Sequence, residues 1–93
     1  MDDRVFAREG EFVLRAVGDV GVIVPIRNRV GDLDSVYVMS PVAMRVWSLI
    51  DGAHDVASII EAVQDEYDVE PDVAASDVID FLDALQNAGL IRR

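Results

Sequence analysis

The hydrophobic pattern of this chain changes its period at Ser40, and this change constrains the fold more than any other feature. Before Ser40, apolar residues alternate with their neighbours, as in β-strands; after it they recur every three or four residues, as in amphipathic helices. The order of the two patterns predicts an α+β chain in which strands come first and helices follow. The length of 93 residues suits one domain around one core.

Three strands are expected before Ser40. Residues 11–16 alternate in polarity and predict a strand with one face toward solvent. Gly18-Asp19 has the chemistry of a turn, so this strand forms a hairpin with a second one, Val20 to Ile26. A polar loop, residues 27–34, leads to a short third strand, Ser35 to Met39. The alternation places Tyr37 opposite its two neighbours but does not show which face is buried.

Three helices are expected after the period changes, at about residues 41–51, 55–68 and 71–88. Ser40-Pro41 is a strong helix start, because serine can cap free amides and proline suits the first helical position. The other expected boundaries are Asp55 and Pro71 at helix starts and Gly52 and Gly89 at helix ends. Residues 90–91 form a short extended segment. We therefore predict a single winged helix-turn-helix domain over residues 1–93, with a three-stranded antiparallel sheet at about residues 11–39 followed by three helices.

The charge of the chain is distributed unevenly. The formal net charge is −10, and residues 51–93 account for −9 of it, with 11 acidic residues and 2 arginines. A segment this negative repels nucleic-acid phosphates and attracts basic partners. The third expected helix contains no arginine or lysine, which argues against DNA binding by the helix-turn-helix. A solvated surface that keeps the protein soluble explains the charge equally well.

Side chains for catalysis are few. The chain has no cysteine, His54 is its single histidine and lies in an expected turn, and Trp47 lies among apolar residues and is expected in the core. We therefore expect no catalytic residue, no metal and no cofactor, and a protein that is not an enzyme. No signal peptide or apolar run of about 20 residues is visible, which predicts a cytoplasmic location.

Asp77, Asp80 and Asp83 recur every three residues along one flank of the third expected helix. They are either a solvated surface or a grip for a basic peptide, and both interpretations stay open. A third hypothesis, a small enzyme subunit that uses these carboxylates, requires one of them to have a raised pKa in an apolar pocket.

Two segments resemble the PqqD-like proteins, the family of RiPP recognition elements. Residues 36–56, VYVMSPVAMRVWSLIDGAHDV, are similar to the part of this family where a tyrosine-bearing strand leads into an Asn/Ser-Pro helix start. Residues 76–91, SDVIDFLDALQNAGLI, resemble its closing signature, in which an Asp-Val pair precedes a leucine-rich helix and a final Gly-Leu-Ile. The resemblance covers most of residues 10–92.

The resemblance implies a function in peptide modification. Proteins of this kind bind the leader of a ribosomally made precursor peptide and present it to a modifying enzyme, often a radical SAM enzyme, or to a leader peptidase; PqqD does so in pyrroloquinoline-quinone biosynthesis. The leader lies as an added strand along the third strand, against the third helix. Carried onto this chain, the implied peptide-binding residues are Ser35, Val36, Tyr37, Val38, Met39, Asp77, Asp80, Phe81 and Ala84.

Elementary physics supports this mode of binding, because a short edge strand offers unpaired backbone groups to an extended peptide. We expect a non-catalytic adaptor whose partners are a precursor peptide and its maturation enzyme, with no nucleic acid and no membrane. An acidic groove would favour a leader with lysine or arginine. The alternative is a regulatory winged-helix protein that binds a protein partner or, less favoured, DNA. Val36 and Val38 flank Tyr37 in a strand with no lysine, which predicts a concentration-dependent homodimer through edge strands.

Overall fold

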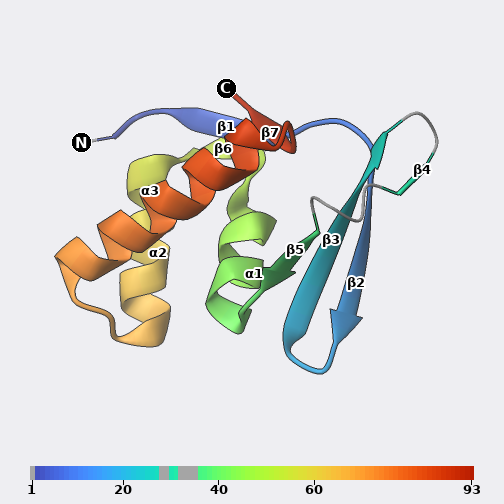
Figure 1. Ribbon diagram of the computed structural model, residues 1–93. Helices are drawn as coiled ribbons and strands as arrows, with labels where there is room; N and C mark the ends of the chain where they lie inside the picture. Colours follow the sequence, from blue (N-terminus) through green and yellow to red (C-terminus); the bar gives the residue numbers. More distant parts are fainter. Residues whose placement is uncertain (1, 28–29, 32–35) are drawn as a thin grey trace.

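The computed structural model describes residues 2–27, 30–31 and 36–93 (Figure 1). In chain order its elements are β1 (Val5–Arg8), β2 (Phe12–Val17), β3 (Val20–Arg27), β4 (Val30–Gly31), β5 (Tyr37–Met39), α1 (Pro41–Leu49), β6 (Asp51–Asp55), α2 (Val56–Tyr67), α3 (Pro71–Asn87) and β7 (Ile91–Arg92). The α+β fold class, with antiparallel strands and three helices, is confirmed. The helix bounds agree with the expected ones to within two residues.

The helix starts form as their sequences predict. The Ser40 side chain accepts a hydrogen bond of 3.2 Å from the amide of Ala43, and Pro41 is the first residue of α1. Asp55 caps α2 in the same way, accepting a bond of 2.8 Å from the amide of Ser58. Each cap satisfies a backbone donor that the first turn of a helix leaves free. The cap at Ser40 therefore fixes the point at which β5 turns into α1.

The strands form two sheets. The hydrophobic pattern predicted only the second sheet, which is built around β3, and not the first, which is built around β1. In the second sheet, β3 pairs with β2, with β4 and with β5. In the first sheet, β1 lies between β6 and β7. Neither β1 nor β6 was predicted: β1 has only four residues, and β6 has the sequence DGAHD, which was expected as a turn. Its pairing with β1 holds Asp51–Asp55 extended, whereas local preference alone favours a turn there.

The hairpin of β2 and β3 lies beside β5 and α1, with β2 as the strand farther from the helices (Figure 1). The prediction of one solvated face for β2 was wrong, because every residue from Val13 to Val17 is exposed. Phe12, at the base of the hairpin, does pack inward, with its ring centroid 5.3 Å from that of Trp47 in an edge-to-face contact. The hairpin is therefore anchored at its base by Phe12 and near its turn by Gly21 of β3, which lies against the Met44 side chain, whereas most of β2 is exposed.

The core lies where the three helices meet the inner sides of both sheets. Trp47 is only 2% exposed, so its expected place in the core is confirmed. Ile23 and Phe6 bring β3 and β1 into the same cluster as the helices. Gly21 lets α1 approach β3 closely, because a Cβ at this position would overlap the side chain of Met44. In the part of the chain that the structure describes, no helix has the length and apolar composition needed to cross a membrane.

Candidate peptide-binding site

β5 is held in its sheet along one edge. Tyr37 lies opposite Ile23 and Met39 lies opposite Gly21 in an antiparallel pairing with β3. Within residues 2–27, 30–31 and 36–93, no strand pairs with the other edge of β5. An unpaired edge presents a row of backbone donors and acceptors that an extended chain can bind.

The two faces of β5 differ sharply, which answers the question that the alternating pattern left open. Met39 is 1% exposed, and the Tyr37 hydroxyl donates a hydrogen bond of 3.1 Å to the Ala84 carbonyl on α3. Val36 and Val38 point the other way and are 37% and 71% exposed. Tyr37 and Met39 therefore face the helices, and Tyr37 ties β5 directly to α3.

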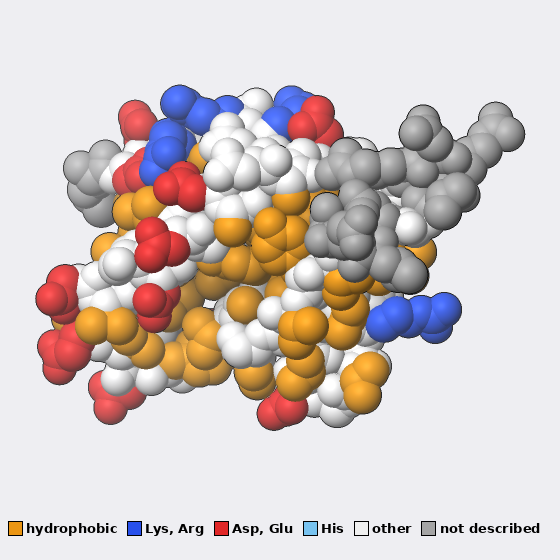
Figure 2. All heavy atoms as spheres, in the orientation of Figure 1, with side chains coloured by type: hydrophobic (Ala, Val, Ile, Leu, Met, Phe, Trp, Pro, Cys, Tyr) orange, Lys and Arg blue, Asp and Glu red, His pale blue; other side chains and the backbone are white. Residues whose placement is uncertain are grey.

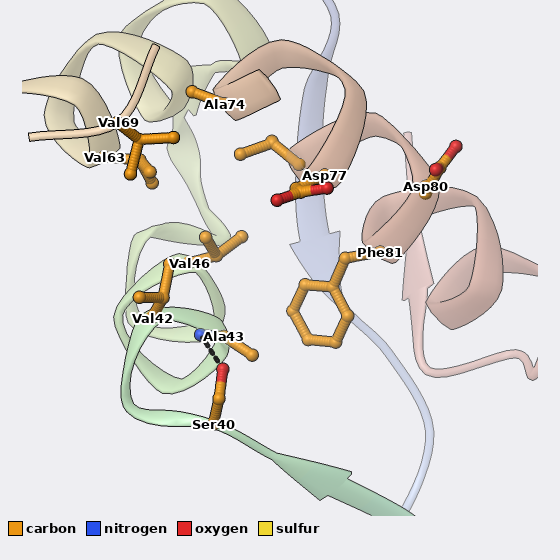
Figure 3. Close-up of a pocket in the computed structure, with 11 residues that line it drawn as sticks. Ser40, Val42, Ala43, Val46, Val63, Val69, Ala74, Asp77, Asp80 and Phe81 are labelled. Atoms are coloured by element: carbon orange, nitrogen blue, oxygen red, sulfur yellow. Dashed lines mark hydrogen bonds between the residues drawn. The ribbon is translucent and has the colours of Figure 1, made fainter. Parts of the chain in front are cut away.

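A pocket of about 430 Å³ lies where the start of α1 faces α2 and α3 (Figure 3). Its lining is Ser40, Val42, Ala43, Val46, Val63, Val69, Ala74, Asp77, Val78, Asp80 and Phe81. Phe81 extends from α3 toward the start of α1 (Figure 3). The volume falls within the ~300–1,000 Å³ typical of ligand pockets, and most of the lining is apolar, as in such pockets.

Two carboxylates lie at this mostly apolar pocket. Asp77 and Asp80 are both exposed, and no described arginine forms an ion pair with either of them. In Figure 3 the carboxylate of Asp77 extends toward the pocket, whereas that of Asp80 turns outward. Asp83, the third member of the predicted flank, does not line the pocket. Acidic side chains gather over α2 and α3 (Figure 2), so the field around the pocket favours cations.

The residues implied by the family resemblance fall into two groups that the structure brings together. Val36, Tyr37, Val38 and Met39 belong to β5 or precede it, and Asp77, Asp80, Phe81 and Ala84 belong to α3. Ser35 lies outside the described residues. The Met39 side chain is buried in the core, so only its backbone is open to a ligand.

The pattern of the sequence missed most of the pocket lining. Val42, Ala43, Val46 and Val63 belong to the apolar residues that recur every three or four positions after Ser40, a pattern that predicts a buried helix face, yet Val42 and Ala43 remain partly exposed. A helical stripe marks residues that face neighbouring helices, but it does not distinguish a filled core from the wall of a pocket. For Val42 and Ala43 the position next to the Ser40 cap was the only available signal, and for Val63 on α2 there was none.

His54 lies apart from the pocket, on β6. Its Nδ1 atom is 2.9 Å from a carboxylate oxygen of Asp51, and both side chains are solvent-accessible. The amide of Ala53, followed by the His54 side chain, lowers the pKa of Asp51 to about 2. Across the described residues, no group of three or more histidine, aspartate or glutamate side chains is arranged to hold a metal ion.

Comparison with known families identifies the chain. Residues 21–91 match the model of the family described as Coenzyme PQQ synthesis protein D (PqqD). The chain belongs to the PqqD family. The resemblance seen in the sequence is thereby confirmed, and the matched region of this PqqD-family chain contains β5, the pocket and α3.

A solved structure shares the fold of this PqqD-family chain. It is described as "TbiB1 in Complex with the TbiA(beta) Leader Peptide", with a TM-score of 0.73 and 24% sequence identity. The match covers 92% of this chain and 94% of the other. No curated protein matched the chain.

Proposed function

We propose that this protein is a non-catalytic adaptor that binds the leader of a ribosomally synthesised precursor peptide and presents it to a modifying enzyme. The observation that carries the proposal is the edge of β5 that no described strand pairs, beside a mostly apolar pocket between α1, α2 and α3. The leader adds to this edge as a further antiparallel or parallel strand. The enzyme that receives the bound leader is a radical SAM maturase or a leader peptidase.

Strand addition accounts for affinity without a demand for one sequence. Backbone hydrogen bonds to β5 hold the peptide, and side chains at every second position point to the same side of the extended sheet as Tyr37. That side faces α3, because Tyr37 bonds to Ala84 there. One set of leader side chains thus lies between β5 and α3.

The pocket adds selectivity for a bulky apolar side chain. The run of β5 leads through Ser40 into α1, so a peptide along β5 reaches the pocket at the Ser40 end. A lysine or arginine next to the apolar anchor would find the carboxylate of Asp77, with Asp80 farther out. Val36, Val38 and Met39 contribute through strand pairing, and Phe81 and Ala84 form the wall on α3.

The known structure with this fold supports the proposal, since TbiB1 was solved with a leader peptide and its likeness extends over nearly the whole chain. The exposed positions of Asp77 and Asp80 do not favour the hypothesis of an enzyme subunit, which needs a carboxylate shielded from water. The alternative of DNA binding is not favoured either, because α3 presents aspartates and no cation.

An NMR footprint tests the proposal. The probe is the leader half of a short precursor peptide encoded beside the gene for this chain, titrated into ¹⁵N-labelled protein. We expect amide shifts to concentrate at residues 36–43 and 77–84, with protection of the β5 amides from hydrogen exchange. Duplex DNA of mixed sequence serves as the comparison and should cause no shifts. Saturable shifts confined to the hairpin or to the outer side of α2, or binding of DNA alone, would contradict the proposal.

A further inference from the structure

The second sheet has an outer surface made almost entirely of valine. The outer valine face consists of Val13, Val17, Val20, Val22, Val24 and Val38. These residues are cross-strand partners or same-face neighbours, because Val13 pairs with Val24, Val17 with Val20, and Val22 with Val38. Ile23 and Met39 point to the opposite side, where both are buried.

The described residues cover the outer valine face only in part, because Val20, Val22 and Val24 are half-buried and the other three members are exposed. Val17 is 69% exposed and Val38 is 71% exposed, and Val13, at 41%, is also open to solvent. Figure 2 shows hydrophobic side chains over the hairpin and β5. Monomeric proteins seldom expose contiguous apolar surface of this kind unless it binds something.

Charge points to a second copy as the occupant. Residues 12–26 and 36–39 contain only two charged side chains, Arg15 and Asp19, so this lobe is locally neutral in a chain of net charge −10. Most of the negative charge lies over α2 and α3, away from the hairpin (Figure 2). Two copies that meet through the outer valine face therefore keep their acidic helices apart, which limits electrostatic repulsion.

Arg15 and Asp19 also complement each other across a two-fold axis. Arg15 pairs with Val22 in register and so lies on the outer valine face, and Asp19 lies in the adjoining turn. In a two-fold symmetric contact each surface meets itself, so the Arg15 of each copy can meet the Asp19 of the other. A different protein would need a matching pair of charges of its own.

The area of the outer valine face limits the expected affinity between two copies. β2 and β3 contribute about six residues each and β5 contributes three, so strands about 4.8 Å apart cover roughly 250 Å² in projection. Stable interfaces bury about 800 Å² on each partner, so this contact belongs to the weak and concentration-dependent class.

We propose that the outer valine face is a homotypic contact, at which a second copy of this chain packs face to face with Arg15 of each copy set against Asp19 of the other. This contact leaves the free edge of β5 open. It therefore differs from the edge-to-edge dimer that the sequence predicts, which would use the backbone of β5.

Sedimentation equilibrium of the full chain tests the proposal, at protein concentrations from about 10 µM to about 1 mM and at roughly 0.15 M salt. We expect dimer to increase with concentration. The near-isosteric double variant Val17→Thr with Val38→Thr should raise the dissociation constant at least about tenfold, because it places two hydroxyls in the contact. The matched control is Val73→Thr, at a valine of α3 that is 47% exposed and outside the face, and it should leave the constant unchanged.

A charge exchange provides the second readout. Arg15→Asp alone should weaken the dimer, and Arg15→Asp combined with Asp19→Arg should restore it, because the exchange recreates the pair across the symmetry axis. A chain that stays monomeric at every concentration overturns the proposal. So does a dimer that survives the double threonine variant, since backbone pairing at β5 would be insensitive to it. A combined charge variant as weak as Arg15→Asp alone overturns the arrangement of the two copies.

Discussion

The hydroxyl of Tyr37 donates a hydrogen bond of 3.1 Å to the main-chain carbonyl of Ala84, across 47 positions of sequence. This contact joins β5, whose second edge is paired by no described strand, to α3, which carries Asp77 and Asp80. The same carbonyl also accepts a bond of 3.1 Å from the amide of Ala88, so it is shared between the helix end and the tyrosine. The bond from Tyr37 therefore positions β5 relative to α3. The Ala84 carbonyl would still have the Ala88 amide as a donor if the tyrosine hydroxyl were removed.

Tyr37→Phe should lower the free energy of unfolding by about 1 kcal/mol, the usual worth of one partly buried hydrogen bond. The cost stays small because the Ala84 carbonyl retains the Ala88 amide as a donor. Urea denaturation of the two proteins measures the difference. Tyr67→Phe, at a tyrosine of α2 that is 38% exposed, is the control and should change stability by much less. A loss above about 3 kcal/mol for Tyr37→Phe would mean that the carbonyl depends on the tyrosine after all.

The sequence predicted those parts of the fold that local chemistry determines. The Ser40 and Asp55 caps, the hairpin turn at Gly18-Asp19 and the apolar stripes of the helices all depend on residues a few positions apart, and each forms as expected. The first sheet depends on β1 meeting β6 and β7, which lie more than 40 residues away. Neither Asp51–Asp55 nor Val5–Arg8 has an alternation of apolar and polar residues that would predict such pairing.

The candidate site could be predicted only in outline. The family resemblance supplied the two elements, β5 and α3, and the structure supplies how they meet. Two features could not be read from periodicity: that Tyr37 points toward α3, and that Asp77 faces a pocket while Asp83 does not. Both depend on the angle at which α3 crosses the other helices, and that angle is set by packing over the whole core.

Asp51 should titrate well below the ordinary pKa of an aspartate. Its pKa is lowered from 3.8 to about 2, first by the amide of Ala53 and then by the side chain of His54. A lowered folded-state pKa contributes stability above the unfolded value of 3.8, and this contribution disappears as the pH falls toward 2. Carboxyl ¹³C chemical shifts followed from pH 6 to pH 1.5 give the value directly. We expect His54→Ala to raise the pKa only in part, because the Ala53 amide remains; full return to the ordinary value would contradict the order of causes.

The charge at the pocket should govern the affinity for a basic peptide. We expect Asp77→Asn to weaken binding of a leader containing lysine or arginine by about two- to fivefold, and Asp80→Asn by less, because the Asp80 carboxylate turns outward. Fluorescence anisotropy at low and high salt measures both the affinity and its salt dependence, which should decrease with each variant. Glu61→Gln combined with Asp65→Asn removes two exposed charges from α2 and lies outside the pocket lining. An equal effect of that control would assign the attraction to the overall field of the helices, and no effect of Asp77→Asn would assign its carboxylate to solvated surface.

Filling the pocket should block the peptide and spare the fold. Ala43 lies in the first turn of α1, is partly exposed and lines the pocket, so Ala43→Leu places a larger side chain in the space proposed for the apolar anchor. Leucine is nearly as good a helix former as alanine, and the added surface is covered by the pocket walls, so the midpoint of thermal unfolding should stay the same or rise slightly. Leader affinity should fall by about tenfold or more, since losing the burial of one large apolar side chain costs about 1.5–3 kcal/mol. Ala75→Leu, on α3 and outside the pocket, is the matched control and should bind as the unmodified protein does. Undiminished binding by a folded Ala43→Leu variant would place the anchor elsewhere along β5.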